Sequence, residues 1–177
     1  MEYFDILDES GSLTGKQATR EEAHEKGLWH RVAHIWIVNS KGEVLIQKRS
    51  PQKDSYPNMW SMSCEGHISA GQEPIQGALR ELKEELDLDL EQKQLSLAFT
   101  YKRSARHSDS FIGNHFIDVY AIKKDIDLSD LTIQEEEISE VKWIKIDDYA
   151  NSVKNNDPTF LNYPDELNRV FGILKSI

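Results

Sequence analysis

The segment GHISAGQEPIQGALRELKEELDL, residues 66–88, decides the fold. Its first third is rich in small residues, which is typical of a loop, and Pro74 suits the first position of a helix. Apolar residues then recur every three or four positions up to a predicted helix end near Asp87, namely Ile75, Ala78, Leu79, Leu82 and Leu86. The pattern predicts a helix with one face against the core.

Three glutamates share one face of this predicted helix. Glu81, Glu84 and Glu85 are spaced i, i+3 and i+4, so a helix places them beside one another. Like charges at this spacing repel, and Arg80 offsets only part of the repulsion. A hard divalent cation offsets more, because Mg²⁺ prefers carboxylate oxygens together with substrate phosphate and water. Taken alone, these residues are equally compatible with an ordinary solvated helix face.

The remaining secondary structure is predicted from alternation, turn residues and helical spacing. Strands are expected at 3–8, 34–38, 44–49, 60–64, 95–101, 111–122 and 141–146, and helices at 18–26, 74–87, 147–154 and 164–175. The segment 101–115 is either a mobile basic loop or a place where Arg103, Arg106 and His107 reach phosphate or a second subunit. Strands on both sides of one strong helix describe an α+β domain.

Composition and charge narrow the possible functions. The chain has 177 residues, and we expect one domain over 1–177 with a strand and helix extension at 1–30 and a helical tail at 147–177. The net charge of −10 argues against nucleic acid polymers and anionic membranes as partners. A single cysteine excludes an internal disulfide, and no signal peptide or membrane-spanning run is seen, so a cytoplasmic protein is expected.

The spacing of residues 66–88 resembles the Nudix box. That motif consists of a glycine, a glutamate six positions later and, after seven further residues, the run Arg-Glu-aliphatic-x-Glu-Glu-x-Gly-aliphatic. The positions in register are Gly66, Arg80, Glu81, Leu82, Glu84, Glu85 and Leu88. Two positions depart from the pattern. Asp87 replaces the late glycine and should mainly affect how the helix ends. Gln72 replaces the first glutamate and removes one negative charge, for which Glu73 or Glu65 is a possible substitute.

This resemblance implies a Nudix-type α/β/α sandwich with a mixed β-sheet and a loop-helix-loop catalytic motif. It also implies Mg²⁺ or Mn²⁺ as cofactor and hydrolysis of a small diphosphate-linked substrate such as a nucleoside diphosphate derivative. By analogy with the family, a homodimer is expected. The implied metal ligands are the Gly66 carbonyl, Glu81, Glu84 and Glu85, while Arg80 would orient the glutamates and Glu81 or Glu84 would activate water. Glu137, from the acidic run before residues 141–146, is an accessory candidate.

Residues 19–67 look like the isopentenyl-diphosphate isomerase branch of this family. Lys48, Arg49 and Lys53 form a basic group suited to a diphosphate, with His67 as a further substrate-binding candidate. Isomerases of that branch use a cysteine directly before the Gly-His pair and a later Glu-x-Glu segment. Here Glu65 precedes Gly66, and Cys64 is shifted to the opposite face of a strand.

The later segment of that branch reads Gly113-Asn114-His115 in this chain and contains no glutamate. Both proton-handling residues are therefore missing, which favours a hydrolase over an isomerase. A non-catalytic module that binds a nucleotide or diphosphate is the third hypothesis. Several histidines bind a second metal in the isomerase branch. Without its glutamates we interpret His24, His30, His67 and His115 as structural.

Overall fold

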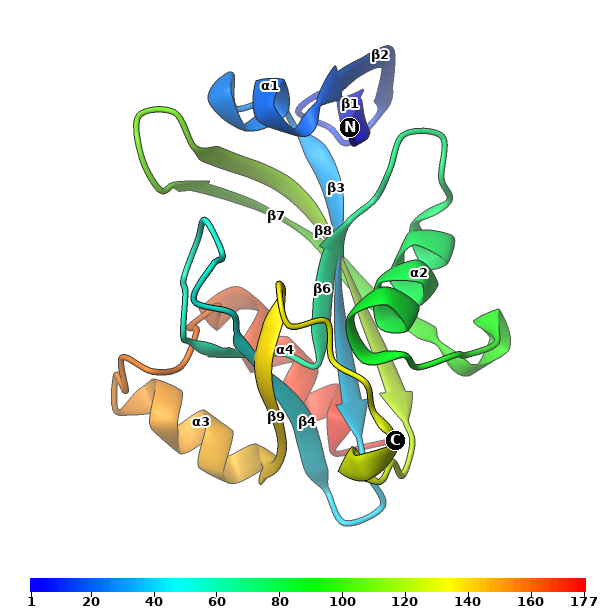
Figure 1. Ribbon diagram of the computed structural model, residues 1–177, viewed down its shortest axis with the longest axis vertical. Helices are drawn as coiled ribbons and strands as arrows, with labels where there is room; N and C mark the ends of the chain where they lie inside the picture. The colour runs from blue at the N-terminus through cyan, green and yellow to red at the C-terminus, as the bar shows by residue number, and fades with distance from the viewer.

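A computed structural model describes residues 1–177 (Figure 1). The strands are β1 (Tyr3–Leu7), β2 (Leu13–Thr19), β3 (His30–Val38), β4 (Glu43–Arg49), β5 (Trp60–Ser61), β6 (Cys64–His67), β7 (Ser96–Arg106), β8 (Ile112–Lys123) and β9 (Ile138–Lys145). The α-helices are α1 (Arg20–Glu25), α2 (Pro74–Leu86), α3 (Ile146–Lys154) and α4 (Pro164–Leu174), with short 3-10 turns at Gln92–Gln94 and Leu128–Asp130. No helix is both long enough and apolar enough to span a membrane.

The central sheet is mixed and it divides around β3. Along its length β3 runs parallel to β8, which pairs antiparallel with β7. On its other edge β3 pairs with β6 over residues 32–35, and it meets β4 only at the pair Val38 and Val44. Beyond that pair β4 leaves β3 and pairs with β9 and β5. Arg49 at the end of β4 and residues 65–67 of β6 line one cavity.

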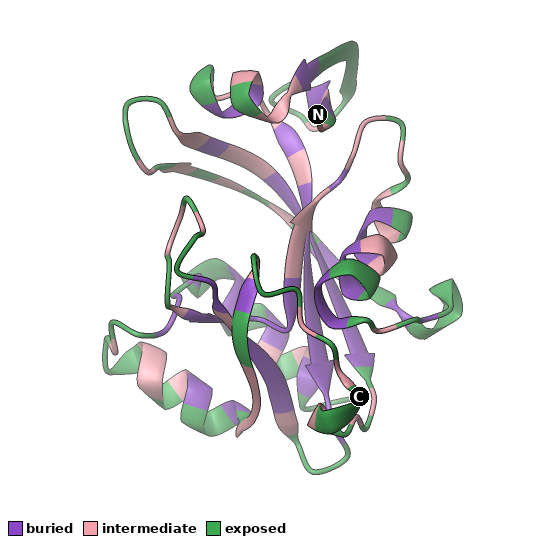
Figure 2. Cartoon of the chain, in the orientation of Figure 1, coloured by how far each residue is buried: buried purple, intermediate pink, exposed green.

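Helices cover both faces of this sheet, because alternate residues of β3 face two different cores. Val32 and Trp36 belong to a cluster completed by residues of α3 and α4. Ala33 and Ile35 belong to a second cluster, beneath Leu82 and the other apolar residues of α2. The centre of the sheet is correspondingly buried, and the exposed residues lie on the outer helix surfaces and turns (Figure 2). The structure confirms the expected mixed sheet with helices on both faces.

The N-terminal extension packs over one end of β3. β1 and β2 form a hairpin, Leu7 bridges to Trp29, and Thr19 caps α1 by accepting a 3.2 Å hydrogen bond from the Glu22 backbone N–H. Phe4 and Ala23 are fully buried in the small core that results. The extension therefore places α1 beside the first residues of β3.

Three of the differences from the sequence-based prediction affect the position of site residues. β3 begins at His30, four residues earlier than expected, and Cys64–His67 is a strand where mainly loop was expected. The segment 101–115 is a hairpin of β7 and β8, because Arg103 pairs with His115 and neighbouring residues continue the ladder on both sides. β3 and β6 are held by strands distant in sequence, whereas β7 and β8 extend a hairpin ladder that the polar composition of residues 101–115 does not reveal.

Candidate functional site

A cavity of about 330 Å³ opens where β6, α2 and the β7–β8 hairpin meet. Gly66, Glu81, Glu84 and Glu85 line one side, and Arg49 and Lys53 come from the end of β4 and the loop after it. The cavity thus brings most of the residues selected from the sequence to one place.

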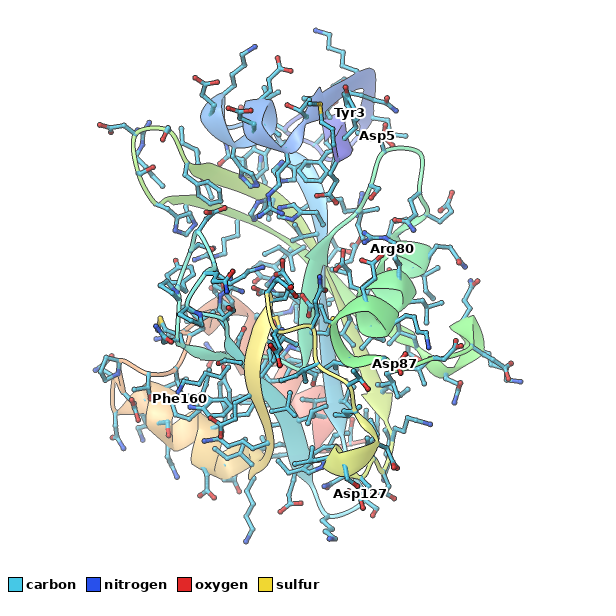
Figure 3. All side chains as sticks on the ribbon, in the orientation of Figure 1. Tyr3, Asp5, Arg80, Asp87, Asp127 and Phe160 are labelled. Atoms are coloured by element: carbon cyan, nitrogen blue, oxygen red, sulfur yellow. The ribbon has the colours of Figure 1, made fainter.

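Arg80 ties the loop to the carboxylate helix. Its guanidinium donates a 2.9 Å hydrogen bond to the His67 carbonyl and lies 2.7 Å from carboxylate oxygens of both Glu81 and Glu84. Figure 3 shows Arg80 on α2 facing the middle of the molecule. One side chain therefore links two carboxylates to the strand that carries Gly66.

Burial raises the pKa of two of the cavity carboxylates, Glu81 and Glu85, because too little positive charge lies near them. The pKa of Glu81 is raised to about 7, mainly by burial and partly by the charge of Glu84, against the lowering effect of Arg80. Burial also raises the pKa of Glu85 to about 8, although a hydrogen bond with Cys64 lowers it. A divalent cation would relieve this deficit, because it favours the charged form of each carboxylate.

The donor set fits a hard divalent metal. Three carboxylates converge on the cavity with Gly66, and a Cβ at residue 66 would overlap the Glu81 side chain. Oxygen ligands of this kind suit Mg²⁺ or Mn²⁺ better than softer metals. Gly66, Glu81, Glu84 and Glu85 are the residues that could hold such an ion.

Two ion pairs involve the basic residues that line this cavity. Arg49 is buried and pairs with Glu65, and its Nε donates a 3.1 Å hydrogen bond to the Ser55 carbonyl. Lys53 pairs with Glu137, the one member of the acidic run 135–137 that lines the cavity. The accessory residues Glu65 and Glu137 therefore hold the bases in place.

Three residues proposed from the sequence lie outside the cavity. Lys48 points to the other side of β4 from Arg49, because side chains alternate along a strand, and its ammonium lies 5.9 Å from the Trp60 ring. Glu73 is the exposed residue that precedes α2. Gln72 lies behind Arg80, with its carbonyl oxygen 3.5 Å from Arg80 Nε. The charge lost at residue 72 is therefore not lost from the cavity wall, and Glu73 does not replace it there.

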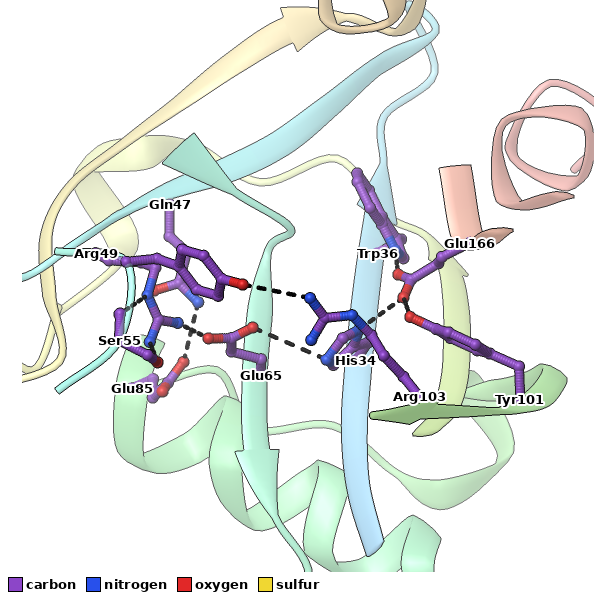
Figure 4. A network of polar contacts seen from close by, with 11 residues as sticks. His34, Trp36, Gln47, Arg49, Ser55, Glu65, Glu85, Tyr101, Arg103 and Glu166 are labelled. Carbon is purple, nitrogen blue, oxygen red and sulfur yellow. Dashed lines mark hydrogen bonds and ion pairs between the residues drawn. The ribbon is translucent and has the colours of Figure 1, made fainter. Parts of the chain in front are cut away.

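A buried glutamate from the tail supports the cavity wall, and sequence reasoning missed it. Glu166, in the first turn of α4, is fully buried and accepts 2.7 Å hydrogen bonds from the His34 ring, Trp36 Nε1 and the Tyr101 hydroxyl (Figure 4). His34 in turn lies 3.9 Å from Glu65. The signal that could have identified it is its place on the helix face shared with the apolar residues Leu167, Val170 and Leu174.

Four histidines from four elements meet at the N-terminal end of β3. Their ligand atoms all lie within 4.8 Å of one another, and they are His24 of α1, His30 of β3, His67 of β6 and His115 of β8. The Nε2 atom of each is buried without a hydrogen-bond partner. Burial lowers the pKa of all four, that of His30 to about 3, so the rings are neutral. Neutral imidazoles with free nitrogens can bind a metal, which a purely structural role does not explain.

The residues that would carry isomerisation are absent from the cavity. Cys64 is fully buried in the core beneath α2, where burial raises the pKa of its thiol, while Glu65 faces the cavity. Gly113 and His115 occupy the later strand segment, and neither is a carboxylate. The one-residue shift therefore has the effect that strand alternation predicts.

Comparison with known proteins places this geometry in context. A sequence profile described as NUDIX domain matches residues 28–163. The chain is 38% identical over 180 residues to Nudix hydrolase 3 of Arabidopsis thaliana, an alignment that covers 98% of this chain and 23% of the plant protein. It is 26% identical over 161 residues to an isopentenyl-diphosphate Delta-isomerase of Cereibacter sphaeroides, covering 88% of this chain and 89% of that protein.

The fold is also similar to that of a solved protein. The crystal structure of DR0079 from Deinococcus radiodurans superimposes with a TM-score of 0.64 at 22% identity, covering 86% of this chain and 90% of the other. At this identity the likeness concerns the fold alone. This chain spans less than a quarter of the length of the plant relative, so that protein's full activity does not transfer to it.

Proposed function

Because this chain belongs to the Nudix hydrolase family, we propose that it hydrolyses a small diphosphate-linked molecule with the help of Mg²⁺ or Mn²⁺. The observation that carries the proposal is the convergence of Glu81, Glu84 and Glu85 on one cavity with Arg49 and Lys53. Carboxylates that can hold a metal and bases that can hold phosphate oxygens are both needed for phosphoryl chemistry.

The cavity carboxylates and the cavity bases have different proposed roles. Glu81, Glu84, Glu85 and the Gly66 carbonyl would hold the ion, which supplies positive charge to the phosphate oxygens and makes the attacking water more acidic. Arg49 and Lys53 would bind and orient the diphosphate by charge-assisted hydrogen bonds. Glu81 or Glu84 would accept the proton of the attacking water, and Arg80 keeps both carboxylates in place.

The test is a screen of diphosphate compounds with Mg²⁺ or Mn²⁺, read by phosphate release and by mass. We expect release of a monophosphate from at least one compound, and Glu84→Gln and Glu85→Gln should each abolish it. Glu73→Gln removes the same charge from an exposed position outside the cavity and should leave the rate unchanged. Full activity in both cavity variants would show that the site is wrongly assigned. Tight binding without any product would favour the non-catalytic module.

The isomerase hypothesis is kept as the alternative because of the relative in Cereibacter sphaeroides. It predicts conversion of isopentenyl to dimethylallyl diphosphate. The buried thiol of Cys64 and the lack of a carboxylate at Gly113 and His115 speak against it. Isomerisation by the wild-type protein that is lost in Cys64→Ala would reverse the ranking.

We also propose that His24, His30, His67 and His115 hold a second metal ion. Four buried Nε2 atoms without partners support this, since leaving such atoms unpaired is costly unless a ligand fills the space. An all-imidazole site favours Zn²⁺ or a similar late transition metal over Mg²⁺. The test is the metal content, measured by mass spectrometry, of one triple variant that carries Glu81→Gln, Glu84→Gln and Glu85→Gln and so lacks the carboxylates of the first metal site. One zinc equivalent that disappears on adding His115→Ala would support the site, and an unchanged content would refute it.

A further inference from the structure

Arg103 of β7 occupies a different part of the cavity from the carboxylate helix. Its guanidinium carbon lies 4.5 Å from the centre of the Tyr163 ring, and Nη2 donates a 3.3 Å hydrogen bond to the Tyr56 hydroxyl. All three residues line the cavity. Tyr163 directly precedes α4 and Tyr56 lies in the loop after β4, so this guanidinium is held between segments far apart in sequence.

Arg103 is the one cavity base without a carboxylate partner. Arg49 pairs with Glu65, Lys53 with Glu137, and Arg80 with Glu81 and Glu84, while Arg20 lies 3.9 Å from Glu2. Arg103 forms no ion pair, although it is partly buried. Its positive charge is therefore left for a ligand to neutralise.

The chemistry of this group suits a phosphate. A guanidinium carries five N–H donors in a planar fork, and Arg103 donates only one hydrogen bond to the protein, to the Tyr56 hydroxyl. Packing on an aromatic ring fixes the plane of the fork, which lowers the entropy cost of binding an anion through two parallel hydrogen bonds. The fork is thus prepared for a group with several anionic oxygens.

We propose that Arg103 determines specificity by binding a free terminal phosphate, so that the chain prefers organic diphosphates whose terminal phosphate carries no ester. This inference rests on the proposed function and names its substrate class. A free terminal phosphate has a charge near −2 at neutral pH, whereas an esterified one has −1. The other cavity bases already have carboxylate partners, so the extra charge needs Arg103. In the reaction water adds to one phosphorus, the bridging P–O bond breaks, and a monophosphate and orthophosphate leave.

The test measures binding, so it does not need turnover. Methylenediphosphonate, which has two free ends, and its P,P′-dimethyl ester, which has none, are titrated calorimetrically into the protein with Mg²⁺. We expect the wild type to bind the free-ended compound about tenfold more tightly, and Arg103→Gln to lose about that factor for this compound while the ester changes by less than about threefold. Arg106→Gln is the matched control, because Arg106 lies on the same strand, is exposed, and does not line the cavity.

Three outcomes would overturn the inference: no discrimination by the wild type, no change in Arg103→Gln, or an equal loss for both compounds. Melting temperatures identify a variant that fails to fold. In that case Arg103→Lys, which keeps the charge and loses the fork, must weaken the free-ended compound selectively, and equal weakening of both refutes the assignment. Selective binding without any hydrolysis would leave Arg103's role standing and refute the proposed activity alone.

Discussion

Gly66 and Glu81 lie so close together that no other residue fits at position 66. A Cβ built there would overlap the carboxyl group of Glu81, which is itself held by Arg80. The contact joins β6 to α2, two elements separated by a loop of six residues. The glycine of the sequence motif is thus explained by close packing of a backbone against a side chain, and not by an unusual backbone angle.

Gly66→Ala should therefore disable the cavity. The added methyl group must push the Glu81 carboxylate or β6 aside, and displacements of about 1 Å at such sites lower rates by about 100-fold. We also expect a loss of about 1–3 kcal/mol in the free energy of unfolding from overpacking. The measurements are hydrolysis rate and urea unfolding. Gly172→Ala is the control, because open space surrounds that helical glycine and the change should stabilise the chain by about 0.5–1 kcal/mol. Wild-type hydrolysis in Gly66→Ala would contradict the packing argument.

Gln72→Glu should restore the motif without restoring a metal ligand. Residue 72 contacts Arg80 from behind, so the new carboxylate would pair with the guanidinium and lie near the N-terminus of α2. Both effects are favourable and together should add about 0.5 kcal/mol to the free energy of unfolding. The Mn²⁺ dissociation constant, measured by calorimetry, should stay within about threefold of the wild type, since such a pair acts only indirectly.

A tenfold tightening of Mn²⁺ binding in Gln72→Glu would mean that this position does reach the ion. Gln76→Glu serves for comparison, because it adds the same charge at an exposed position on the same helix. It should change neither the metal affinity nor the rate.

Asp87→Gly should stabilise the end of α2. Asp87 has φ 52° and ψ 31°, the left-handed region, where it ends the helix through hydrogen bonds to the carbonyls of Leu82 and Lys83. Glycine adopts this conformation without steric cost, and an aspartate at a helix C-terminus also opposes the helix dipole. The loss of the exposed ion pair with Lys83 offsets part of the gain, which leaves about 0.5 kcal/mol.

Urea unfolding of Asp87→Gly and Asp87→Asn separates the two contributions. The asparagine variant removes the ion pair and keeps a side chain that tolerates left-handed backbone. It should therefore be no more stable than the wild type. A glycine variant less stable than the asparagine variant would show that backbone strain at residue 87 is negligible.

Local patterns predicted the parts of the fold that depend on local forces. The helix expected at 74–87 is observed at Pro74–Leu86, because proline placement and three- to four-residue spacing act within one element. Gly66, Glu81 and Glu85, which the motif singles out, line one cavity. Lys48 was misplaced because sequence proximity to Arg49 says nothing about which face of a strand a side chain occupies.

The rest of the cavity depends on contacts between distant segments. Arg103 and His115 oppose each other only because β7 pairs with β8 in one particular register. The four histidines meet because α1 folds back onto β3, and Glu166 reaches His34 across 132 positions of sequence. A single sequence carries no periodic signal for such contacts, so these residues could be named as candidates but not brought together.

Glu166→Gln should destabilise the chain, and the effect should fade in acid. The amide would present a donor where three donors now point at carboxylate oxygens, and breaking a buried charged network of this kind costs about 3–5 kcal/mol. Burial by itself raises the pKa of Glu166, but the charge of His34 and the hydrogen bonds from His34, Trp36 and Tyr101 outweigh it, so the pKa lies below its usual value. A carboxyl whose folded-state pKa is lowered stabilises the fold fully above the unfolded-state pKa of about 4.5, and this contribution is lost as pH falls through the folded-state pKa.

Urea unfolding of the wild type and of Glu166→Gln from pH 7 down to pH 3 measures the difference between their free energies of unfolding at each pH. Taking the difference removes the titration of the other carboxylates, which both proteins share. The difference should be constant from pH 7 to about pH 5 and shrink below about pH 4.5. A difference that stays constant through this range would show that Glu166 is not ionised in the folded protein.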